Sequence, residues 1–222
     1  EANNAMHDCD LMINIGARFD DRITGKIDEF SPKSKKVHID IDPSSIGKIV
    51  KVDLALVSDV NTFLLALIKR FKEKNKNFTD VNKENIAKWW KQIDTWRKKK
   101  SLNYKSSDTI IKPQYAVERL YELTKNQDTF ITTEVGQHQM WAAQYYKFNK
   151  PNRWMTSGGL GTMGFGLPAA IGVQIANPGK LVVDIAGEAS VLMTMQEIST
   201  AVQYKLPIKI FILNNQYMGM VR

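Results

Sequence analysis

Short apolar runs that fit β-strands alternate with segments of helical periodicity along the chain, and this alternation limits the possible folds more than any other feature. Residues 11–16 form an apolar run that ends in glycine, 37–42 alternate with period two, and 60–71 repeat with the period of a helix. Strands joined by crossover helices form a parallel sheet that is covered on both faces. The pattern therefore predicts an α/β fold.

The alternation stops over a charged stretch and then resumes. The second set of expected elements is a helix at 113–125, a strand at 129–133, a helix at 167–176, a strand at 181–185, a helix at 191–204 and a strand at 208–213. For a chain of 222 residues, this interrupted alternation predicts two doubly wound parallel-sheet domains, 1–71 and 111–222, which are joined by a helical connector at 72–110. Because both chain ends cut through this pattern, we expect a segment of a longer protein.

The formal net charge is +8, but the excess lies almost entirely in and around the connector. Residues 69–105 contain 13 Lys and Arg against four Asp and Glu, so the rest of the chain is close to neutral. Trp89, Trp90 and Trp96 lie there at helical spacing without a nucleic-acid-binding motif. We interpret the segment as a solvated linker with an amphipathic helix, the alternative being a polyanion site, and expect no nucleic-acid partner.

Two further features bear on the location of the protein. The single cysteine, Cys9, excludes an intrachain disulfide, and no targeting pattern is present, so we expect a cytoplasmic protein. The longest uncharged run, 155–179, has 25 residues, but seven are glycine and two are proline. Such a run predicts turns and a short buried helix, and we expect no membrane span.

The clearest chemical pattern lies near the end of the chain. The strand at 181–185 runs into Glu188, and the next strand is followed by Asn215, 27 residues after Glu188. With one helix between them, the two strands should end at the same edge of the sheet, where open α/β folds bind ligands. A carboxylate and an amide oxygen suit Mg²⁺. On spacing alone, a helix start and an asparagine turn explain the pattern equally well.

Two other segments add polar or flexible groups to that edge. Gln137 and His138 follow another predicted strand and Glu134, so their donors could hold an anionic diphosphate, although a histidine after a strand is more often structural. The glycine-rich run 157–168 opens a helix, and its glycines permit close approach of the backbone to a ligand. As a glycine loop by itself, this run is a weak indication.

Together these residues resemble the thiamine diphosphate enzymes, whose signature is Gly-Asp-Gly followed at similar spacing by Asn-Asn. Residues 135–144, 156–171 and 206–221 are similar, more narrowly, to the catalytic subunits of the acetolactate synthase (acetohydroxyacid synthase) family. The resemblance reaches back to 16–22 and 38–43, which are similar to the FAD-holding middle domain of that family.

This resemblance implies roles for the two predicted domains. Residues 1–71 would be the C-terminal part of the FAD-associated middle domain, and 111–222 would be a truncated thiamine diphosphate-binding domain. Glu188, the Asn215 side chain and the Tyr217 backbone carbonyl would hold Mg²⁺. Contacts to thiamine diphosphate would come from Gln137, His138, Gly161, Met163, Ala189, Ser190, Gly219 and Met220.

Met163 would wedge the cofactor into its bent, reactive form, and the catalytic glutamate would come from a domain outside this chain. The chain departs from the family signature at one place, because Glu188 and Ala189 stand where the family has aspartate and a second glycine. The longer glutamate must be refitted into the tight octahedron of Mg²⁺. A helix-capping acid at Glu188 is the alternative.

The FAD site rests on the resemblance as well. Residues 1–71 contain no Gly-x-Gly-x-x-Gly motif, and by composition 18–22 could be a charged turn, although an acid at a strand end, such as Asp40, is suited to ribose hydroxyls. The residues implied to contact FAD, which the family uses without net redox, are Gly16, Ala17, Arg18, Phe19, Asp20, Asp21, Asp40, Ile41, Asp59 and Val60.

The implied activity is that of acetolactate synthase: decarboxylation of pyruvate on thiamine diphosphate and transfer of the two-carbon unit to a second 2-oxo acid, pyruvate or 2-oxobutanoate, in branched-chain amino-acid biosynthesis. A homodimer or homotetramer with the active site between subunits, and a small regulatory subunit, are implied too. The alternatives are another flavin-associated thiamine enzyme, of glyoxylate carboligase or pyruvate oxidase type, and a non-catalytic fragment or basic module that binds polyanions with steep salt dependence.

Overall fold

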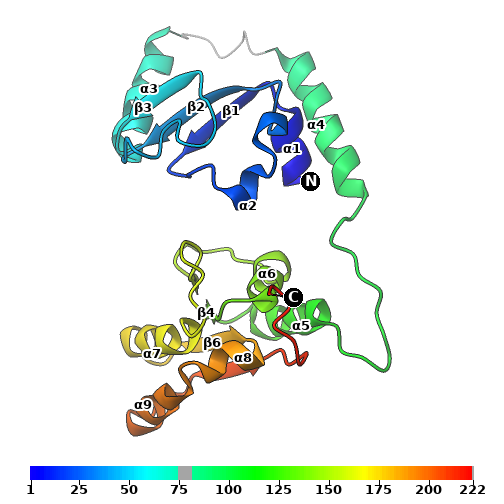
Figure 1. Ribbon diagram of the computed structural model, residues 1–222, viewed down its shortest axis with the longest axis vertical. Helices are drawn as coiled ribbons and strands as arrows, with labels where there is room; N and C mark the ends of the chain where they lie inside the picture. The colour runs from blue at the N-terminus through cyan, green and yellow to red at the C-terminus, as the bar shows by residue number, and fades with distance from the viewer. Residues whose placement is uncertain (75–81, 222) are drawn as a thin grey trace. The chain divides into compact units, whose positions relative to one another are not determined.

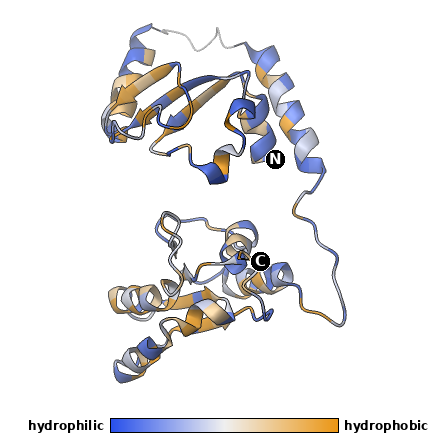
Figure 2. Cartoon of the chain, viewed as in Figure 1, coloured by the Kyte–Doolittle hydropathy of each residue, from blue (hydrophilic) through white to orange (hydrophobic). Residues whose placement is uncertain are grey.

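A computed structural model describes residues 1–74 and 82–221 of the chain (Figure 1). The chain divides into two compact units, Glu1–Ser101 and Leu102–Arg222. Each unit contains one sheet, and all strand pairs in both sheets are parallel. The predicted α/β fold with two parallel-sheet domains is therefore confirmed. The strands are mostly hydrophobic, whereas helix α4 (Lys83–Lys98) is mostly hydrophilic (Figure 2).

The first unit has three strands in the order β1-β2-β3. Their bounds are β1 Leu11–Ile15, β2 Lys35–Asp40 and β3 Leu54–Val57; the helical elements are α1 Ala2–Asp8, α2 Asp21–Thr24, the 3₁₀ turn η1 Ile27–Glu29 and α3 Val60–Lys74. Phe19 and His38 are buried with their rings edge to face, 5.2 Å apart. Parallel pairing brings the carboxyl ends of all three strands to one edge, with Ile15 opposite Ile39 and Asp40 opposite Val57.

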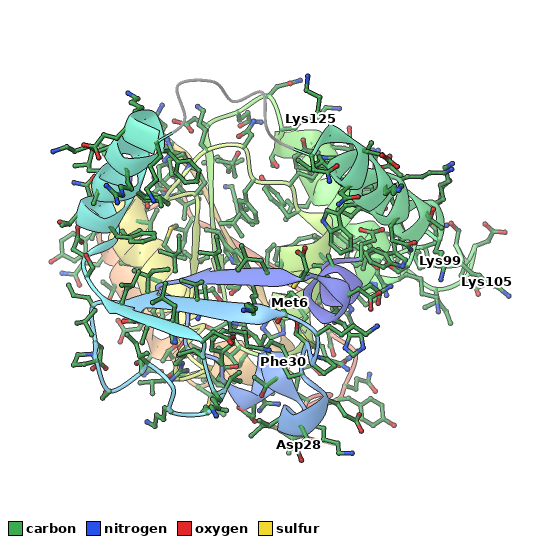
Figure 3. All side chains as sticks on the ribbon, turned by 90° about the horizontal axis from the view of Figure 1, so that it is seen from above. Met6, Asp28, Phe30, Lys99, Lys105 and Lys125 are labelled. Atoms are coloured by element: carbon green, nitrogen blue, oxygen red, sulfur yellow. The ribbon has the colours of Figure 1, made fainter. Side chains whose placement is uncertain are left out.

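Helix α4 (Lys83–Lys98) carries much of the lysine-rich segment. The Asn82 side chain caps its start by accepting a hydrogen bond from the N–H of Asn85. Trp96 is buried and packs edge to face against Trp89, as expected for an amphipathic helix. The side chains of Lys99 and Lys105 point away from the ribbon (Figure 3). Residues 75–81 of the predicted connector lie outside the described residues.

The second unit has four strands in the order β5-β4-β6-β7. The strands are β4 Thr129–Thr133, β5 Trp154–Thr156, β6 Leu181–Ala186 and β7 Lys209–Ile212; the helical elements are α5 Pro113–Thr124, α6 Gln137–Tyr145, α7 Gly166–Ala176, α8 Glu188–Leu192, the 3₁₀ turn η3 Met195–Glu197 and α9 Ile198–Gln203. One face of the sheet packs against α5 and α6, where Ile131 and Val183 contribute to the core. On the other face, Phe130 and Val182 pack against α7. Helices thus cover both faces, as in a doubly wound fold.

The prediction of one helix at 191–204 is wrong in one respect, because the helical segment is interrupted. α8 ends at Leu192, and a 3₁₀ turn separates it from α9. At the break, the Thr194 hydroxyl donates to the carbonyl of Gly164, 3.1 Å away. A bond to a distant loop competes with the regular helix, and periodicity alone does not reveal it.

The uncharged run 155–179 folds as the sequence indicated. It contributes to β5, forms a glycine-rich loop and then forms the 11-residue helix α7. Among the described residues, no helix is long and apolar enough to cross a membrane.

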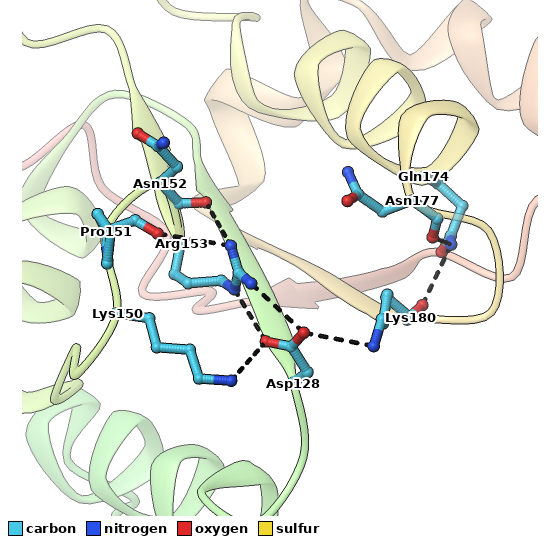
Figure 4. A network of polar contacts seen from close by, with 8 residues as sticks. All are labelled: Asp128, Lys150, Pro151, Asn152, Arg153, Gln174, Asn177 and Lys180. Carbon is cyan, nitrogen blue, oxygen red and sulfur yellow. Dashed lines mark hydrogen bonds and ion pairs between the residues drawn. The ribbon is translucent and has the colours of Figure 1, made fainter.

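The Asp128 carboxylate forms ion pairs with residues at the amino ends of neighbouring strands (Figure 4). Asp128 precedes β4 and pairs with Arg153, which precedes β5, at 2.9 Å, and with Lys180, which precedes β6, at 3.3 Å. Lys150 pairs with the same carboxylate at 3.4 Å. The Arg153 guanidinium, followed by Lys180 and Lys150, holds the pKa of Asp128 well below its usual value. These ion pairs help to hold the sheet together at the edge opposite the candidate site.

Candidate functional site

The carboxyl ends of β4, β6 and β7 bring three sequence segments to one edge of the second sheet. The N–H of Glu134 donates to the carbonyl of Ile185 at 3.0 Å, and the N–H of Leu213 donates to the carbonyl of Ala186 at 2.8 Å. The ladder therefore continues just past the strand ends. As predicted, the segments that begin at Gln137, Glu188 and Asn215 all follow neighbouring strands of this sheet.

Glu188 and Asn215 converge on one backbone group. The N–H of Tyr217 lies 3.0 Å from Oε1 of Glu188 and 3.0 Å from Oδ1 of Asn215. The two side-chain oxygens are therefore at most about 6 Å apart. Among the described residues, no three His, Cys, Asp or Glu side chains are grouped as a metal site. A cation at this position would depend on amide and carbonyl oxygens in addition to one carboxylate.

The His138 ring lies near Glu188 and packs closely against two glycines, Gly136 and Gly187. A Cβ on Gly187 would come within 2.8 Å of its Nδ1, and one on Gly136 would be 2.6 Å from its Cε1. Only glycine leaves room for the ring at these two positions. The ring is 6% exposed, and its Nε2 has no hydrogen-bond partner. Burial lowers the pKa of His138 to about 4, so at neutral pH the ring is uncharged.

The segment near the end of the chain that contains Gly219 packs against the start of α6, next to His138. The Gln137 side chain lies against Gly219 so closely that a Cβ there would overlap its amide oxygen. Met220 follows and is 48% exposed. Ser190 is buried and donates through its hydroxyl to the carbonyl of Gly187, 3.2 Å away, with Ala189 half-buried next to it. The predicted diphosphate residues are thus close neighbours.

The glycine-rich loop between β5 and α7 lies next to Glu134. Gly161 has a φ of +67°, a left-handed conformation that favours glycine, and a Cβ there would lie 3.9 Å from Val135. Met163 is half-buried. The N–H of Gly164 donates to Oε2 of Glu134 at 2.6 Å, and the N–H of Leu167 donates to Oε1 at 3.0 Å.

A second group of predicted residues lies in the first unit, at the carboxyl ends of its strands. Gly16 follows β1 with a φ of +64° and donates its N–H to Ile39 at 2.9 Å, whereas Ala17 accepts from the Asn14 amide. Asp20 caps α2 and pairs with Arg18 at 3.6 Å, and Asp21 is the first residue of that helix. Phe19 is buried, so its ring belongs to the core.

The remaining residues of this group lie at or just after the ends of β2 and β3. Asp40 accepts from the N–H of Asp42 at 2.9 Å, and Asp59 caps the start of α3 by accepting from two N–H groups through Oδ1. Ile41 and Val60 are 71% and 44% exposed. The residues predicted to contact FAD thus share one edge of the first sheet, although several of their polar groups already bond locally.

Comparisons with known proteins cover both units. The model described as the thiamine pyrophosphate enzyme central domain matches residues 1–67, and the thiamine pyrophosphate enzyme C-terminal TPP binding domain matches residues 134–222. The chain belongs to the thiamine pyrophosphate enzyme family. Thiamine pyrophosphate is another name for thiamine diphosphate, so the predicted cofactor class is confirmed.

The curated relatives that align with the whole chain include several acetolactate synthase large subunits. The chain is 46% identical over 222 residues to isozyme 3 of Escherichia coli and 45% identical over 223 residues to the protein of Haemophilus influenzae. It is 46% identical over 221 residues to the protein of the alga Cyanidium caldarium. Each match covers all of this chain and 37–38% of the relative. The predicted resemblance to the acetolactate synthase family is confirmed.

Two residues that hold the thiamine-binding unit together were not among the predicted site residues. Asp184 is fully buried in β6 and accepts from the Thr132 hydroxyl at 3.0 Å. Burial and the nearby charge of Glu134 raise the pKa of Asp184 to about 7. Both Asp184 and Glu134 lie in or next to apolar strands, and a carboxylate at such a position is the signal that could have identified them.

Proposed function

We propose that the chain is the flavin-associated and thiamine diphosphate-binding part of an acetolactate synthase. The observation that carries the proposal is the convergence of Glu188 and Asn215 beside His138, in a chain that is 46% identical over its full length to an acetolactate synthase large subunit. Because the chain spans about 38% of that relative, activity, substrates and partners are inferred for the longer protein.

The residues at the edge of the second sheet fit thiamine diphosphate with Mg²⁺. Glu188, the Asn215 side chain and the Tyr217 carbonyl would hold the cation and so anchor the diphosphate. The Nε2 of His138 is buried without a partner, and it would donate to a phosphate oxygen when it carries a proton. Gln137, Ala189 and Ser190 lie around the same point.

When bound, thiamine diphosphate supplies a carbon nucleophile and an electron sink for decarboxylation of a 2-oxo acid. The chain's own residues orient and shield that carbon. Met163 and Gly161 would contact the rings, with Met163 as the bulky wedge, and Gly219 and Met220 would line the same pocket. Transfer to pyruvate or 2-oxobutanoate would then begin branched-chain amino-acid biosynthesis.

We propose FAD as the ligand of the first unit, in a structural role. The support is the shared edge at which Asp40 ends β2 while Gly16 and Asp59 follow β1 and β3, which is where such sheets bind nucleotides. Asp40 is the candidate for ribose hydroxyls. The backbone of 16–21 would approach the nucleotide, because the side chains of Phe19 and Asp20 are already engaged.

For the longer protein we propose a cytoplasmic homodimer or homotetramer with its active site between subunits, and a small regulatory subunit. The single cysteine agrees with a reducing compartment. The catalytic glutamate would come from another domain.

The test is an assay of the full-length gene product with thiamine diphosphate, Mg²⁺ and FAD. Pyruvate alone should give acetolactate, and pyruvate with 2-oxobutanoate should give the mixed product as well. Ligation of glyoxylate in place of pyruvate, or oxidation of pyruvate with reduction of the flavin, would assign the chain to one of the alternative enzymes. Omission of FAD should lower the thermal midpoint without changing the type of product.

A further inference from the structure

The loop that carries Met163 is fixed on both sides of this residue. Before it, the N–H of Thr162 donates to the Ser157 hydroxyl at 3.0 Å. After it, the Gly164 N–H donates to Glu134, and the Gly164 carbonyl accepts from the Thr194 hydroxyl at 3.1 Å. The peptide groups next to Met163 therefore have little freedom, whereas Met163 itself makes no such bond through its side chain.

Glu134 is the central group of this arrangement. Its side chain is fully buried, and its two oxygens accept from different N–H groups, Oε2 from Gly164 and Oε1 from Leu167. These N–H groups lie on either side of the start of α7, so one carboxylate links the loop to the helix. Charge-assisted hydrogen bonds of this kind are roughly twice as strong as neutral ones.

The surroundings favour a single charge at this position. Asp184, the neighbouring buried acid, accepts from the Thr132 hydroxyl through Oδ1, and its Oδ2 has no partner. Gly166 packs so closely between Asp184 and the backbone of Glu134 that a Cβ would overlap both. Burial raises the pKa of both acids, but the N–H groups on the two Glu134 oxygens oppose this effect, whereas the charge of Glu134 raises the pKa of Asp184 further.

We propose that Glu134 is a positioning residue for the reaction, because its carboxylate fixes the loop that presents Met163 to the cofactor. The inference rests on the proposed role of Met163 and gives Glu134 no contact with substrate. Both of its oxygens are occupied by N–H groups within the protein, so it is not available as an acid or base toward the cofactor. Loss of this anchor should displace the loop without removing any group that binds the diphosphate.

The test uses the full-length gene product with four variants. Glu134→Gln replaces one accepting oxygen by an N–H₂ group, so one of the two backbone bonds is lost. Glu134→Asp keeps the charge with a shorter reach, and Thr194→Val removes only the bond to the Gly164 carbonyl. Glu122→Gln is the control, because Glu122 is a surface residue paired with Lys125.

The first readout is amide hydrogen exchange in the protein without cofactor. For Glu134→Gln we expect exchange to rise about 10- to 100-fold at whichever of Gly164 and Leu167 loses its acceptor, as for a lost hydrogen bond to a charged group. Glu134→Asp should lie between this variant and the parent, Thr194→Val should affect Gly164 and its neighbours, and the control should match the parent. Unchanged exchange in Glu134→Gln would overturn the proposal.

The second readout is turnover. At saturating thiamine diphosphate, Glu134→Gln should lower kcat about tenfold or more and change KM for pyruvate by less than about threefold, because displaced groups lose rate more than binding. Faster exchange with unchanged kcat would also overturn the positioning role. If Glu134→Gln does not fold, Glu134→Asp decides with the same readouts. If the parent makes no acetolactate, the proposed function fails, and the exchange experiment still tests the anchor.

Discussion

Glu188 and Asn215 accept hydrogen bonds from the same backbone N–H, that of Tyr217, each at 3.0 Å. Residues 27 positions apart in the chain thus present two oxygens to one point at the sheet edge. Two oxygens that share one donor can also share one cation, provided that the cation replaces the N–H as their partner. The Tyr217 carbonyl belongs to the same short segment and is the third candidate ligand.

We predict that Glu188→Gln weakens Mg²⁺-dependent binding of thiamine diphosphate about tenfold or more, because a neutral amide is a poorer ligand than a carboxylate. The measurement is a titration of Mg²⁺ at fixed cofactor concentration, followed by intrinsic fluorescence. Glu188→Asp, which keeps the charge, should bind more tightly than Glu188→Gln. Equal Mg²⁺ affinity in the parent and Glu188→Gln would remove the carboxylate from the proposed metal site.

For Met163→Ala we predict a loss of turnover of about tenfold or more at saturating thiamine diphosphate, with a smaller change in cofactor affinity. A wedge organises a reactive conformation instead of supplying most of the binding contacts. Met195→Ala serves as the control, since Met195 is 54% exposed and lies on the 3₁₀ turn. Turnover that stays at the parent level would make Met163 a packing residue.

Local patterns in the sequence were enough to predict the elements that position the site. The strand expected at 129–133 coincides with β4, and the helix expected at 167–176 starts one residue later than α7. β4 is a short run that is buried at every position, and α7 is a mostly apolar helix that follows a glycine-rich run, so length and flanking residues distinguish the two. The parallel pairing of β6 and β7 then followed from the helical segment predicted between them, which placed Glu188 and Asn215 at one edge.

The interactions that hold the glycine-rich loop between β5 and α7 could not be predicted from local sequence patterns. Thr194 breaks the helix expected at 191–204 because it bonds to Gly164, 30 residues away. Likewise, the short strand β5 and the three-way pairing of Asp128 depend on neighbours that are distant in sequence. Glu134 was only noted next to the His138 motif, and its anchoring of Gly164 and Leu167 required the structure.

A further prediction concerns Asp128. Because the pKa of Asp128 is lowered in the folded state, its charge contributes stability above its unfolded value of 3.8, and this contribution is lost as the pH falls through the folded pKa. Asp128→Asn should therefore lower Tm by a few degrees at pH 7, with a smaller deficit below pH 3.8. Thermal scans across pH measure this. Asp94→Asn, at an exposed helical ion pair, should show a much smaller change at every pH.

Asp184 should show the opposite dependence. Its pKa rises from 3.8 to about 7 on folding, so the stability of the neutral form is complete below pH 3.8 and is lost as the pH rises toward 7. Asp184→Asn cannot ionise, so its Tm relative to the parent should improve from pH 5 to pH 8. Thr132→Val, which removes the hydroxyl donor, should not share this trend. A pH-independent difference for Asp184→Asn would contradict burial of an ionisable acid.

The last prediction is that the 222-residue chain, expressed alone, makes no acetolactate with thiamine diphosphate, Mg²⁺ and FAD supplied. The family resemblance assigns the acid that activates the cofactor to another domain, and Glu134, the nearest buried glutamate in the proposed site, is already bonded to Gly164 and Leu167. A positioned acid–base group contributes about 10²–10⁴-fold in rate, so turnover should be at least that far below the full-length protein. The purified chain is incubated with pyruvate and assayed for acetolactate, and cofactor binding is measured in parallel. Turnover near that of the full-length protein would place the catalytic acid within these residues, and Glu134→Gln would then be the first variant to reassess.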